Sequence, residues 1–385
     1  MRILLFSVIV LSAQSIDDLS FGTDSTFEAL TWNIEWFPKN GQTTVNYVSQ
    51  IIEALDVDLL ALQEISDTTV FKQMVNNLDG YDYYFKSGWY AGLAYVYKPD
   101  VIQIDQIYEI YTTQPYWSPF PRSPMVMEFT FQNENYVIIN NHYKCCGDGI
   151  LDLDDPGDEE TRRYIAQNLL TDYINNHFAD DNVFLVGDLN DNLTDIPQNN
   201  VFQLTLNDTD NYLFADYGIA AGSSSDWSYP TWPSHLDHIL ITYELFDEHN
   251  NPNTVVQTIK VDQFLPGGWN EYDVNISDHR PVAIKFTPQQ GLQVAGLYSP
   301  ELACINYPNP FNPITTIQYE LPQRSDVQIT IYDLLGREVT MLVSETQDAG
   351  YKSIQWNASN VPSGTYFYQI KTGEYVQIRK MILLK

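Results

Sequence analysis

The chain of 385 residues has few basic residues and few cysteines. Its 19 lysines and arginines face 50 aspartates and glutamates, which gives a formal net charge of −31. This charge argues against binding of polyanions through a broad basic surface, and it favours a soluble protein that attracts divalent cations. The 3 cysteines cannot form a complete disulfide framework because their number is odd. Cys145 and Cys146 are neighbours, and a bridge between them would be strained, so we expect both to be reduced and packed.

Long apolar segments are scarce as well. After a charged start at Arg2, residues 3–11 form an apolar core, and small residues follow up to Ser15. A run of this length is too short to cross a bilayer, and the arrangement is typical of a signal peptide. We therefore predict a signal peptide over residues 1–15, with cleavage after Ser15. No other segment is long and apolar enough for a transmembrane helix, so we predict an exported protein without stable membrane insertion.

The most informative stretch that is present covers residues 183–191. The apolar residues 183–186 predict a strand that is buried on both faces, and Gly187 then lets the chain turn. Asp188 and Asn190 lie on the same side of an extended chain. Such polar groups are costly inside a hydrophobic layer, so we place them at the open end of the strand, where ligands bind in layered α/β folds. An ordinary Asx-rich turn is the alternative interpretation.

Five further segments share this design, in which an apolar run carries a polar side chain at its end. They are residues 31–37 with Asn33, 59–64 with Glu64, 137–142 with His142, 236–240 with Asp237, and 277–282 with Asp278 and His279. With these motifs the sequence resembles the endonuclease/exonuclease/phosphatase superfamily, which includes deoxyribonuclease I and bacterial sphingomyelinases. The resemblance covers about residues 27–287, and the motifs occur in the family's order. It implies an α/β fold, a four-layer sandwich of two mainly antiparallel sheets flanked by helices.

The residues of these motifs suit the hydrolysis of phosphodiesters. That reaction needs an activated water, neutralised phosphate oxygens and a stabilised leaving group. Glu64 and Asn33 offer the oxygen ligands that Mg²⁺ or Mn²⁺ prefers. We expect Asp188 to deprotonate the water and Asn190 to hold a non-bridging phosphate oxygen.

The resemblance implies the remaining roles. Asp237 matches the residue that keeps His279 protonated and oriented, and Asp278 matches a residue that supports the metal. His142 would donate to the phosphate or to the leaving group. In deoxyribonuclease I an acidic residue orients the histidine that matches His142, whereas residues 89–92 of this chain contain no acid. This departure weakens the likeness to deoxyribonuclease I itself and leaves the superfamily chemistry intact.

A loop over residues 114–124 carries aromatic side chains and Arg122. Residues 120–124 resemble an Arg-x-Pro element of the deoxyribonuclease I group, whose arginine contacts phosphate; an ordinary surface arginine is the alternative. Aromatic side chains of the loop, among them Tyr116, Trp117 and Phe120, would stack on bases. The leading prediction is therefore a secreted endonuclease that acts on DNA and/or RNA. The alternatives are a sphingomyelinase-like or other small-substrate phosphodiesterase or phosphatase, and a catalytically silent surface-binding protein.

Helical spacing and capping residues predict the main helices. They cover residues 43–56, a segment capped by Ser66 or Asp67 that runs to about Leu78, and a segment after the N-cap Asp158 that buries Ile165, Leu169, Tyr173 and Ile174. Before this last helix the chain is strongly acidic. Asp152, Asp154, Asp155 and Asp158 offer a structural Ca²⁺ site, but Pro156-Gly157 breaks EF-hand spacing, so a solvated acidic loop is the favoured interpretation.

The composition changes after the motif region. We predict a catalytic domain over residues 16–287, a linker over 288–304 and a small all-β, Ig-like sandwich over 305–385. Residues 307–313 (Tyr-Pro-Asn-Pro-Phe-Asn-Pro), residues 336–339 (Gly-Arg-Glu-Val) and the basic end resemble the type A C-terminal sorting domain of the type IX secretion system. A generic adhesive module is the alternative. The resemblance implies that type IX secretion machinery is a partner and that the protein passes through the periplasm to be secreted or held at the cell surface.

Overall fold

The computed structural model describes residues 14–86, 91–288, 304–307, 309, 311–321, 324–334, 336–373, 375–383 and 385. The chain divides into two compact units, Met1–Gln289 and Gln290–Lys385. Nearly all of the predicted signal peptide and of the linker over residues 288–304 lies outside the described residues, as do Trp89 and Tyr90. Within the described part of the chain, no helix has the length and apolar character needed to cross a membrane.

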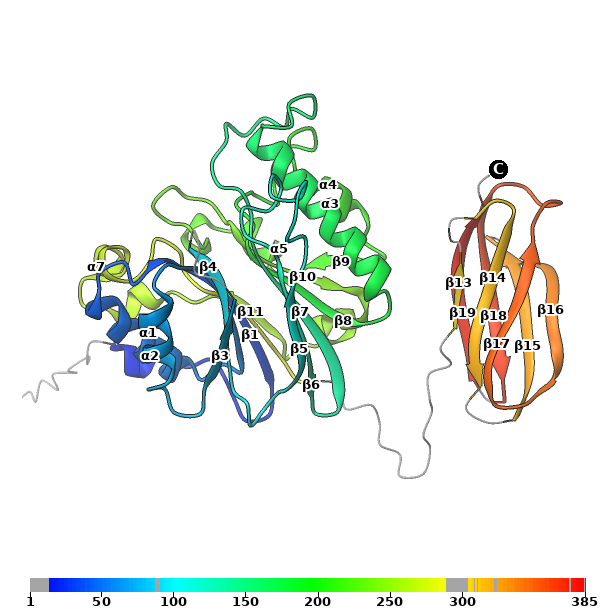
Figure 1. Ribbon diagram of the computed structural model, residues 1–385, viewed down its shortest axis with the longest axis horizontal. Helices are drawn as coiled ribbons and strands as arrows, with labels where there is room; N and C mark the ends of the chain where they lie inside the picture. Colours follow the sequence, from blue (N-terminus) through cyan, green and yellow to red (C-terminus); the bar gives the residue numbers. More distant parts are fainter. Residues whose placement is uncertain are drawn as a thin grey trace, which may run out of the picture. The chain divides into compact units, whose positions relative to one another are not determined.

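The first unit contains two six-stranded sheets (Figure 1). The first sheet has the order β11 (Val255–Thr258), β12 (Val282–Phe286), β1 (Phe27–Phe37), β2 (Leu59–Ile65), β4 (Gly92–Tyr97) and β3 (Asp82–Phe85). The second has the order β5 (Gln103–Glu109), β6 (Met125–Phe131), β7 (Glu134–His142), β8 (Asn182–Asp188), β10 (Asp237–Thr242) and β9 (Tyr212–Phe214). Strands β1 and β2 are parallel, as are β7 and β8, and the other neighbours are antiparallel.

The two sheets pack face to face around aromatic side chains. Phe27 of the first sheet stacks on Phe129 and Tyr136 of the second, with ring centroids 5.6 and 5.7 Å apart. Leu59 and Tyr95 belong to the same buried cluster, which contains residues of both sheets. Burial of this much apolar surface is the main term that holds the sheets together.

Helices cover the outer faces of both sheets (Figure 1). The longer ones are α1 (Gln42–Leu55), α2 (Thr68–Val75), α3 (Glu159–His177) and α7 (Gly268–Asn275), and the short ones are α4 (Gln203–Asn207), α5 (Tyr217–Ala220), α6 (Phe246–Asn250), η1 (Ile16–Asp18), η2 (Ser224–Asp226), η3 (Tyr243–Leu245) and η4 (Val261–Phe264). Side chains of α1 and α2 pack on the first sheet, and those of α3 pack on the second. The predicted four-layer fold is thus confirmed.

The face of α3 that meets the sheet differs from the prediction. Ala166, Leu170 and Ile174 are buried, whereas Ile165 is 37% exposed. The buried side also includes charged and polar residues, of which Arg163 is one. Because Arg163 is satisfied by polar partners from other segments, hydrophobicity alone could not identify the buried face.

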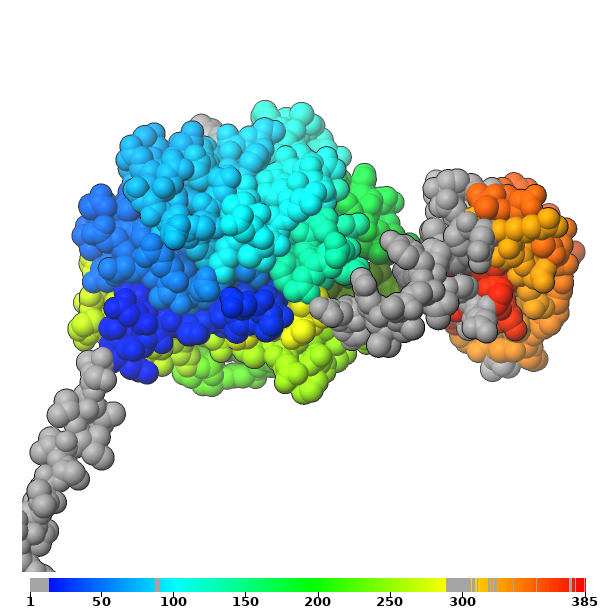
Figure 2. All heavy atoms as spheres, turned by 90° about the horizontal axis from the view of Figure 1, so that it is seen from below, coloured from blue at the N-terminus to red at the C-terminus, as the bar shows by residue number. Residues whose placement is uncertain are grey.

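Strands from the start and the end of the first unit lie side by side. Residues 27–31 of β1 pair with residues 282–286 of β12. In the face seen in Figure 2, segments from the first part of the unit, coloured blue to cyan, accordingly lie against later segments, coloured yellow-green. Long-range pairing of this kind brings motifs that are far apart in the sequence to one sheet.

The second unit is all-β in its described residues. One sheet has the order β13 (Cys304–Tyr307), β14 (Ile314–Leu321) and β17 (Gly350–Asn357). The other has the order β16 (Glu338–Gln347), β15 (Ser325–Asp333), β18 (Gly364–Thr372) and β19 (Tyr375–Leu383). Ile329, Tyr368 and Trp356 lie in a core to which both sheets contribute. The predicted all-β sandwich is confirmed.

Candidate active site

Strand pairing places three predicted site residues at one end of the second sheet. Asp188, the last residue of β8, pairs with His142 in β7 and with Asp237 in β10. Gly187, just before Asp188, has a φ of +147°, and a Cβ there would lie 2.0 Å from the carbonyl oxygen of Asn141. Only glycine allows the strands to approach this closely. The approach places the three side chains at the same position along neighbouring strands.

One oxygen of Asp188 faces side chains from three other segments. Its Oδ2 accepts a hydrogen bond from Asn33 Nδ2 (2.9 Å) and lies 3.4 Å from His142 Nε2 and 3.7 Å from His279 Nε2. Its Oδ1 accepts from the backbone N–H of Asn190 (3.1 Å). The carboxylate therefore stands at the centre of the cluster.

A second carboxylate comes from the first sheet. Glu64 near the end of β2 has a positive φ of 67°, accepts from Asn33 Nδ2 (3.3 Å) at Oε1, and accepts from the N–H of Trp36 (3.0 Å) at Oε2. Asn33 directs its amide nitrogen at both Glu64 and Asp188, and its Oδ1 accepts from the N–H of Glu35 (2.9 Å). In this orientation Asn33 positions the two carboxylates, and its oxygen is used by the backbone and not presented beside Glu64.

His279 is held by contacts at the ring and at the backbone. Its Nδ1 lies 2.7 Å from Asp237 Oδ2, and its carbonyl oxygen accepts from Trp32 Nε1 (3.1 Å) and from the Tyr272 hydroxyl (2.7 Å). Burial acts to lower the pKa of His279, but the negative charges of Asp237 and Asp188 outweigh it and raise the pKa well above its usual range. The ring is consequently an imidazolium at neutral pH.

His142, in contrast to His279, is held in its neutral form. Burial lowers its pKa well below the usual range, and the positive charges of Arg122 and His279 act in the same direction. Its Nδ1 is buried and has no hydrogen-bond partner within the described segments, as expected for a histidine that lacks an orienting acid. Arg122 Nε donates to the carbonyl of Ala91 (3.1 Å). The structure thus brings Arg122 into the electrostatic surroundings of the cluster.

Burial and neighbouring charges also set the state of Asp188. Burial raises the pKa of Asp188 to about 7, with further contributions from Asp237 and Glu64, while His279 and Asn33 act against them. A carboxyl group with a pKa near neutrality can take up a proton and return it. Asp188 therefore has the properties of a general base.

The remaining predicted residues lie at the edge of this cluster. Asn190, with φ +55°, donates from Nδ2 to the carbonyl of Tyr143 (3.3 Å). Asp278 Oδ1 lies 3.9 Å from His279 Nε2, and the Asp278 N–H donates to Glu35 Oε2 (2.9 Å). All nine predicted site residues are thus in or beside one cluster.

Glu35 is a site residue that the sequence analysis missed. It lies in the same motif as Asn33, has a positive φ of 32°, and forms an ion pair with Lys39. Burial raises the pKa of Glu35, and the charge of Asp278 adds to the effect, while Lys39 opposes it. Its place within the Asn33 motif, two residues after the asparagine, was the signal that could have identified it.

The carboxylates of the site fit a divalent cation. Asp188, Asp237 and His279 each place one ligand atom within 4.8 Å of those of the other two. Burial and neighbouring acids raise the pKa values of Asp188 and Glu35. A divalent cation relieves the repulsion between neighbouring acids, and Mg²⁺ and Mn²⁺ prefer oxygen ligands of this kind.

Two further histidines, on either side of Asp237 in the sequence, form a separate buried group with Asp216. His235 Nε2 and His238 Nδ1 lie 3.0 and 2.6 Å from the same oxygen of the buried Asp216. Burial acts to raise the pKa of Asp216, but His238 and His235 hold it well below its usual range. Asp216 also accepts from the N–H of Ile239 (2.8 Å), so this group braces the start of β10, where Asp237 stands.

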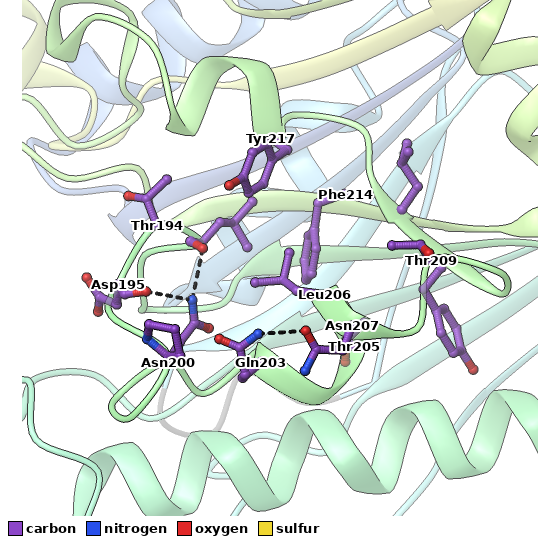
Figure 3. Close-up of a pocket in the computed structure, with 14 residues that line it drawn as sticks. Thr194, Asp195, Asn200, Gln203, Thr205, Leu206, Asn207, Thr209, Phe214 and Tyr217 are labelled. Atoms are coloured by element: carbon purple, nitrogen blue, oxygen red, sulfur yellow. Dashed lines mark hydrogen bonds between the residues drawn. The ribbon is translucent and has the colours of Figure 1, made fainter.

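A separate hollow of about 470 Å³ is lined by residues that follow β8 in the sequence (Figure 3). Thr194, Asp195 and Tyr217 are among its lining residues, and Asn200 donates to the carbonyl groups of Leu193 and Asp195. None of the predicted site residues lines it. The hollow is therefore distinct from the cluster around Asp188.

The expectation for the adjacent cysteines is half correct. Cys145 and Cys146 are free, but both are exposed and not packed. Their sulfur atoms lie 3.0 Å apart, and Lys144 donates to the carbonyl of Cys145 (2.8 Å). They lie in the loop that follows His142, where no apolar layer covers them.

Two face-to-face sheets flanked by helices, with carboxylates and histidines at a common end, define a four-layer α/β sandwich with a polar site. The model of the endonuclease/exonuclease/phosphatase family matches residues 30–279, and the chain belongs to that family. Its members are metal-dependent phosphoric ester hydrolases. A model described as a secretion system C-terminal sorting domain matches residues 306–384, which agrees with the predicted type IX sorting domain and indicates secretion or surface attachment.

Solved structures with the same fold have low sequence identity. D. rerio TDP2 complexed with single strand DNA product is 13% identical, with a TM-score of 0.52, and the match covers 68% of this chain and 99% of that chain. D. rerio TDP2 humanized by 14 mutations is also 13% identical, with a TM-score of 0.50 and the same coverage. The human Nocturnin catalytic domain with bound sulfate is 14% identical, with a TM-score of 0.48, and 68% of this chain and 94% of that chain are covered. The chain has no significant sequence match among curated proteins.

Proposed function

We propose that the protein is a secreted, metal-dependent phosphodiester hydrolase and that its substrate is nucleic acid. The observation that carries the proposal is the arrangement around Asp188. Its Oδ2 lies between a neutral His142 (3.4 Å) and a charged His279 (3.7 Å), beside the Glu64 carboxylate. A base close to a fixed positive charge suits attack of water on a phosphate diester.

Each residue has a distinct role in the proposed reaction. Asp188 orients the attacking water and takes its proton. His279, kept charged by Asp237, stabilises the negative charge that develops on the phosphate. Asn190 uses one amide hydrogen for the Tyr143 carbonyl and has a second for a non-bridging oxygen. His142 donates from Nε2 to the phosphate or the leaving oxygen.

Mg²⁺ or Mn²⁺ would be held by Glu64, with Asp278 and Glu35 as the other acids in reach. When bound, the cation neutralises phosphate charge and stabilises the leaving oxygen. Asn33 bridges Glu64 and Asp188 by donating to both (3.3 and 2.9 Å). We therefore assign Asn33 a positioning role and not the direct metal contact expected from sequence.

Two exposed tryptophans support nucleic acid as the substrate. Trp36 is 51% exposed, and its N–H donates to Glu64. Trp232 is 78% exposed and lies between Tyr229 and Ser234, which form a β-bridge; the Tyr229 ring is centred 4.8 Å from the His279 ring. Large exposed aromatic rings in segments that contact the catalytic cluster are suited to stacking on bases. Phe120, which was expected to stack on bases, is instead buried against Tyr111.

The net charge favours a second candidate, a phosphodiesterase or phosphatase for small substrates. A chain with a charge of −31 repels a long polyanion, whereas a small diester is affected much less. Arg122 and Lys144 are the basic residues that we expect to contact phosphate, and they would supply few such contacts. Nucleic acid binding would accordingly depend on the cation and on stacking.

The test is a comparison of substrates with the purified protein. Plasmid DNA, RNA, sphingomyelin and bis-(p-nitrophenyl) phosphate are assayed in Mg²⁺, in Mn²⁺ and in EDTA. We expect cleavage of DNA or RNA that EDTA abolishes and that added Mg²⁺ or Mn²⁺ restores. Brisk turnover of sphingomyelin or the small diester with no cleavage of nucleic acid would transfer the assignment to the second candidate. Undiminished activity in EDTA would contradict the role of the metal.

A further inference from the structure

The acidic loop between His142 and α3 gathers three carboxylates that the proposed reaction does not use. Asp148, Asp158 and Glu160 each place one oxygen within 4.8 Å of those of the other two. Asp148 is exposed, Asp158 is half-buried and Glu160 is only 2% exposed. The cluster therefore extends from the surface into the protein.

Backbone groups of the loop hold these carboxylates in place. Glu160 Oε1 accepts from the N–H of Gly149 (2.7 Å) and lies 3.1 Å from Arg163 Nη2. Asp158 Oδ2 accepts from the N–H of Thr161 (2.8 Å), and Asp148 Oδ1 accepts from the N–H of Ile150 (3.0 Å). In each case the bonds named here engage one oxygen of the carboxylate. Because the two oxygens are rigidly joined, these bonds also restrict the position of the other oxygen.

The second oxygen of Glu160 is the informative atom. Glu160 Oε2 is buried and has no hydrogen-bond partner in the part of the chain that the structure describes. An unsatisfied buried polar atom costs about 1–3 kcal/mol, and more when it is charged, so such atoms call for a ligand. This oxygen belongs to a side chain that shares a site with two other acids.

Gly147 shows how closely the loop is shaped around this carboxylate. Its φ is +109°, and a Cβ there would lie 2.2 Å from Glu160 Oε1 and 2.5 Å from Oε2. The loop backbone thus packs directly against both oxygens, which only glycine permits. The carboxylate is enclosed by the loop and not directed into bulk solvent.

We propose that Asp148, Asp158 and Glu160 bind a calcium ion. Ca²⁺ takes six to eight oxygen ligands in flexible geometry, and its ligand oxygens lie about 2.3–2.6 Å away, so opposite ligands are roughly 4.6–5.2 Å apart. Three carboxylates within 4.8 Å, from an irregular loop and the first turn of α3, suit this ion better than the compact octahedron of Mg²⁺. The proposed set shares only Asp158 with the four aspartates named from the sequence.

Arg163, whose Nη2 faces Glu160 Oε1, also has partners outside the cluster. Arg163 Nε donates to Asp191 (2.9 Å), and its Nη1 donates to the carbonyl groups of Lys144 (2.8 Å) and Cys146 (2.7 Å). The same contacts join the acidic loop to the segment that follows Asp188. Calcium would therefore order a loop that adjoins the catalytic cluster.

The test is calcium binding measured by isothermal titration calorimetry in a Glu64→Gln background, which removes the proposed catalytic metal ligand. We expect one calcium site in this protein, and a thermal unfolding midpoint that rises with calcium. Asp148→Asn, Asp158→Asn and Glu160→Gln should each weaken binding by about ten-fold or more, since the number of charged ligands sets affinity. Asp154→Asn removes a charge from the same loop outside the cluster and should bind like the parent.

Each outcome decides the proposal independently of enzymatic activity. Binding that is equal in all loop variants, or no binding in the Glu64→Gln protein, overturns it. Asp148 is exposed, and asparagine at position 158 still caps a helix, so these two variants remain informative if Glu160→Gln does not fold.

Discussion

Asp237 and Asp188 pair across strands β10 and β8, and they approach the two nitrogen atoms of one imidazole ring. Asp237 Oδ2 lies 2.7 Å from His279 Nδ1, while Asp188 Oδ2 lies 3.7 Å from His279 Nε2. The closer carboxylate is a permanent charge partner of the histidine. The more distant one lies beyond hydrogen-bond distance from the ring, and its pKa of about 7 suits proton transfer.

Replacement of either catalytic group should abolish most of the activity. Asp188→Asn removes the proposed base, and His279→Ala removes the positive charge, so each should lower turnover by about 100-fold or more. The far-ultraviolet circular dichroism spectrum should be unchanged. Turnover close to that of the parent protein in either variant would show that the roles are wrongly assigned.

Asp237→Asn should change the pH profile as well as the rate. Loss of the Asp237 charge lowers the pKa of His279, so the alkaline fall in kcat/KM should begin at lower pH. The same charge raises the pKa of Asp188. The acid limb of the pH profile, which lies near pH 7 when the metal concentration is limiting, should therefore also move to lower pH. A bound cation stabilises the carboxylate and moves this limb in the same direction. If Asp237 were merely structural, activity would fall at every pH and neither limb would move.

The exposed tryptophans offer a test of substrate class. Trp36→Ala and Trp232→Ala should raise KM for a single-stranded oligonucleotide by about ten-fold, because a stacked base contributes roughly 1–3 kcal/mol. Kinetics on bis-(p-nitrophenyl) phosphate should be nearly unchanged, since this small diester does not reach both rings. Equal effects on both substrates would instead indicate damage to the Glu64 region.

Glu28 predicts a pH-dependent stability that is unrelated to catalysis. Burial, with a contribution from Asp58, raises the pKa of Glu28 to about 8, although Thr26 opposes it by a hydrogen bond. Between the unfolded value of about 4.5 and the folded value of about 8, the unfolded chain releases this proton and the folded protein keeps it, so stability falls as pH rises.

Glu28→Gln should remove this contribution because glutamine does not titrate. Urea unfolding at pH 5 and at pH 8 provides the measurement. The variant should lose less free energy of unfolding than the parent between these two values, by roughly 1 kcal/mol or more, since one pKa unit corresponds to about 1.4 kcal/mol. Identical losses in the two proteins would mean that Glu28 is ionised in the folded state.

Removal of residues 305–385 should separate secretion from catalysis. The buried clusters of the first unit contain residues up to Phe286, and that of the second unit begins at Phe311. Each unit therefore has its own core, and the truncated protein should retain full turnover in vitro. In the native host it should accumulate in the periplasm, as shown by immunoblots of cell fractions. Truncated protein at the cell surface would contradict the sorting role.

The sequence by itself determined which segments become strands and which side chains stand at their ends. Apolar runs such as residues 59–62 and 183–186 favour burial, and each is followed within two residues by a carboxylate of the site, Glu64 or Asp188. The N-cap role of Asp158 also depends on a local contact, since its carboxylate accepts from the N–H of Thr161 within the same turn. Patterns of this kind depend on neighbours in the sequence, which is why they could be read directly.

Contacts between distant segments decided the rest. The orientation of Asn33 depends on Glu64 and Asp188, which lie in other strands, and the Glu35 contact with Asp278 joins opposite ends of the first unit. The buried face of α3 is decided in the same way, because Arg163 is satisfied by Asp191. Hydrophobic periodicity contains no information about such polar partners. Only the packed fold, in which each buried charge must find its counterpart, specifies them.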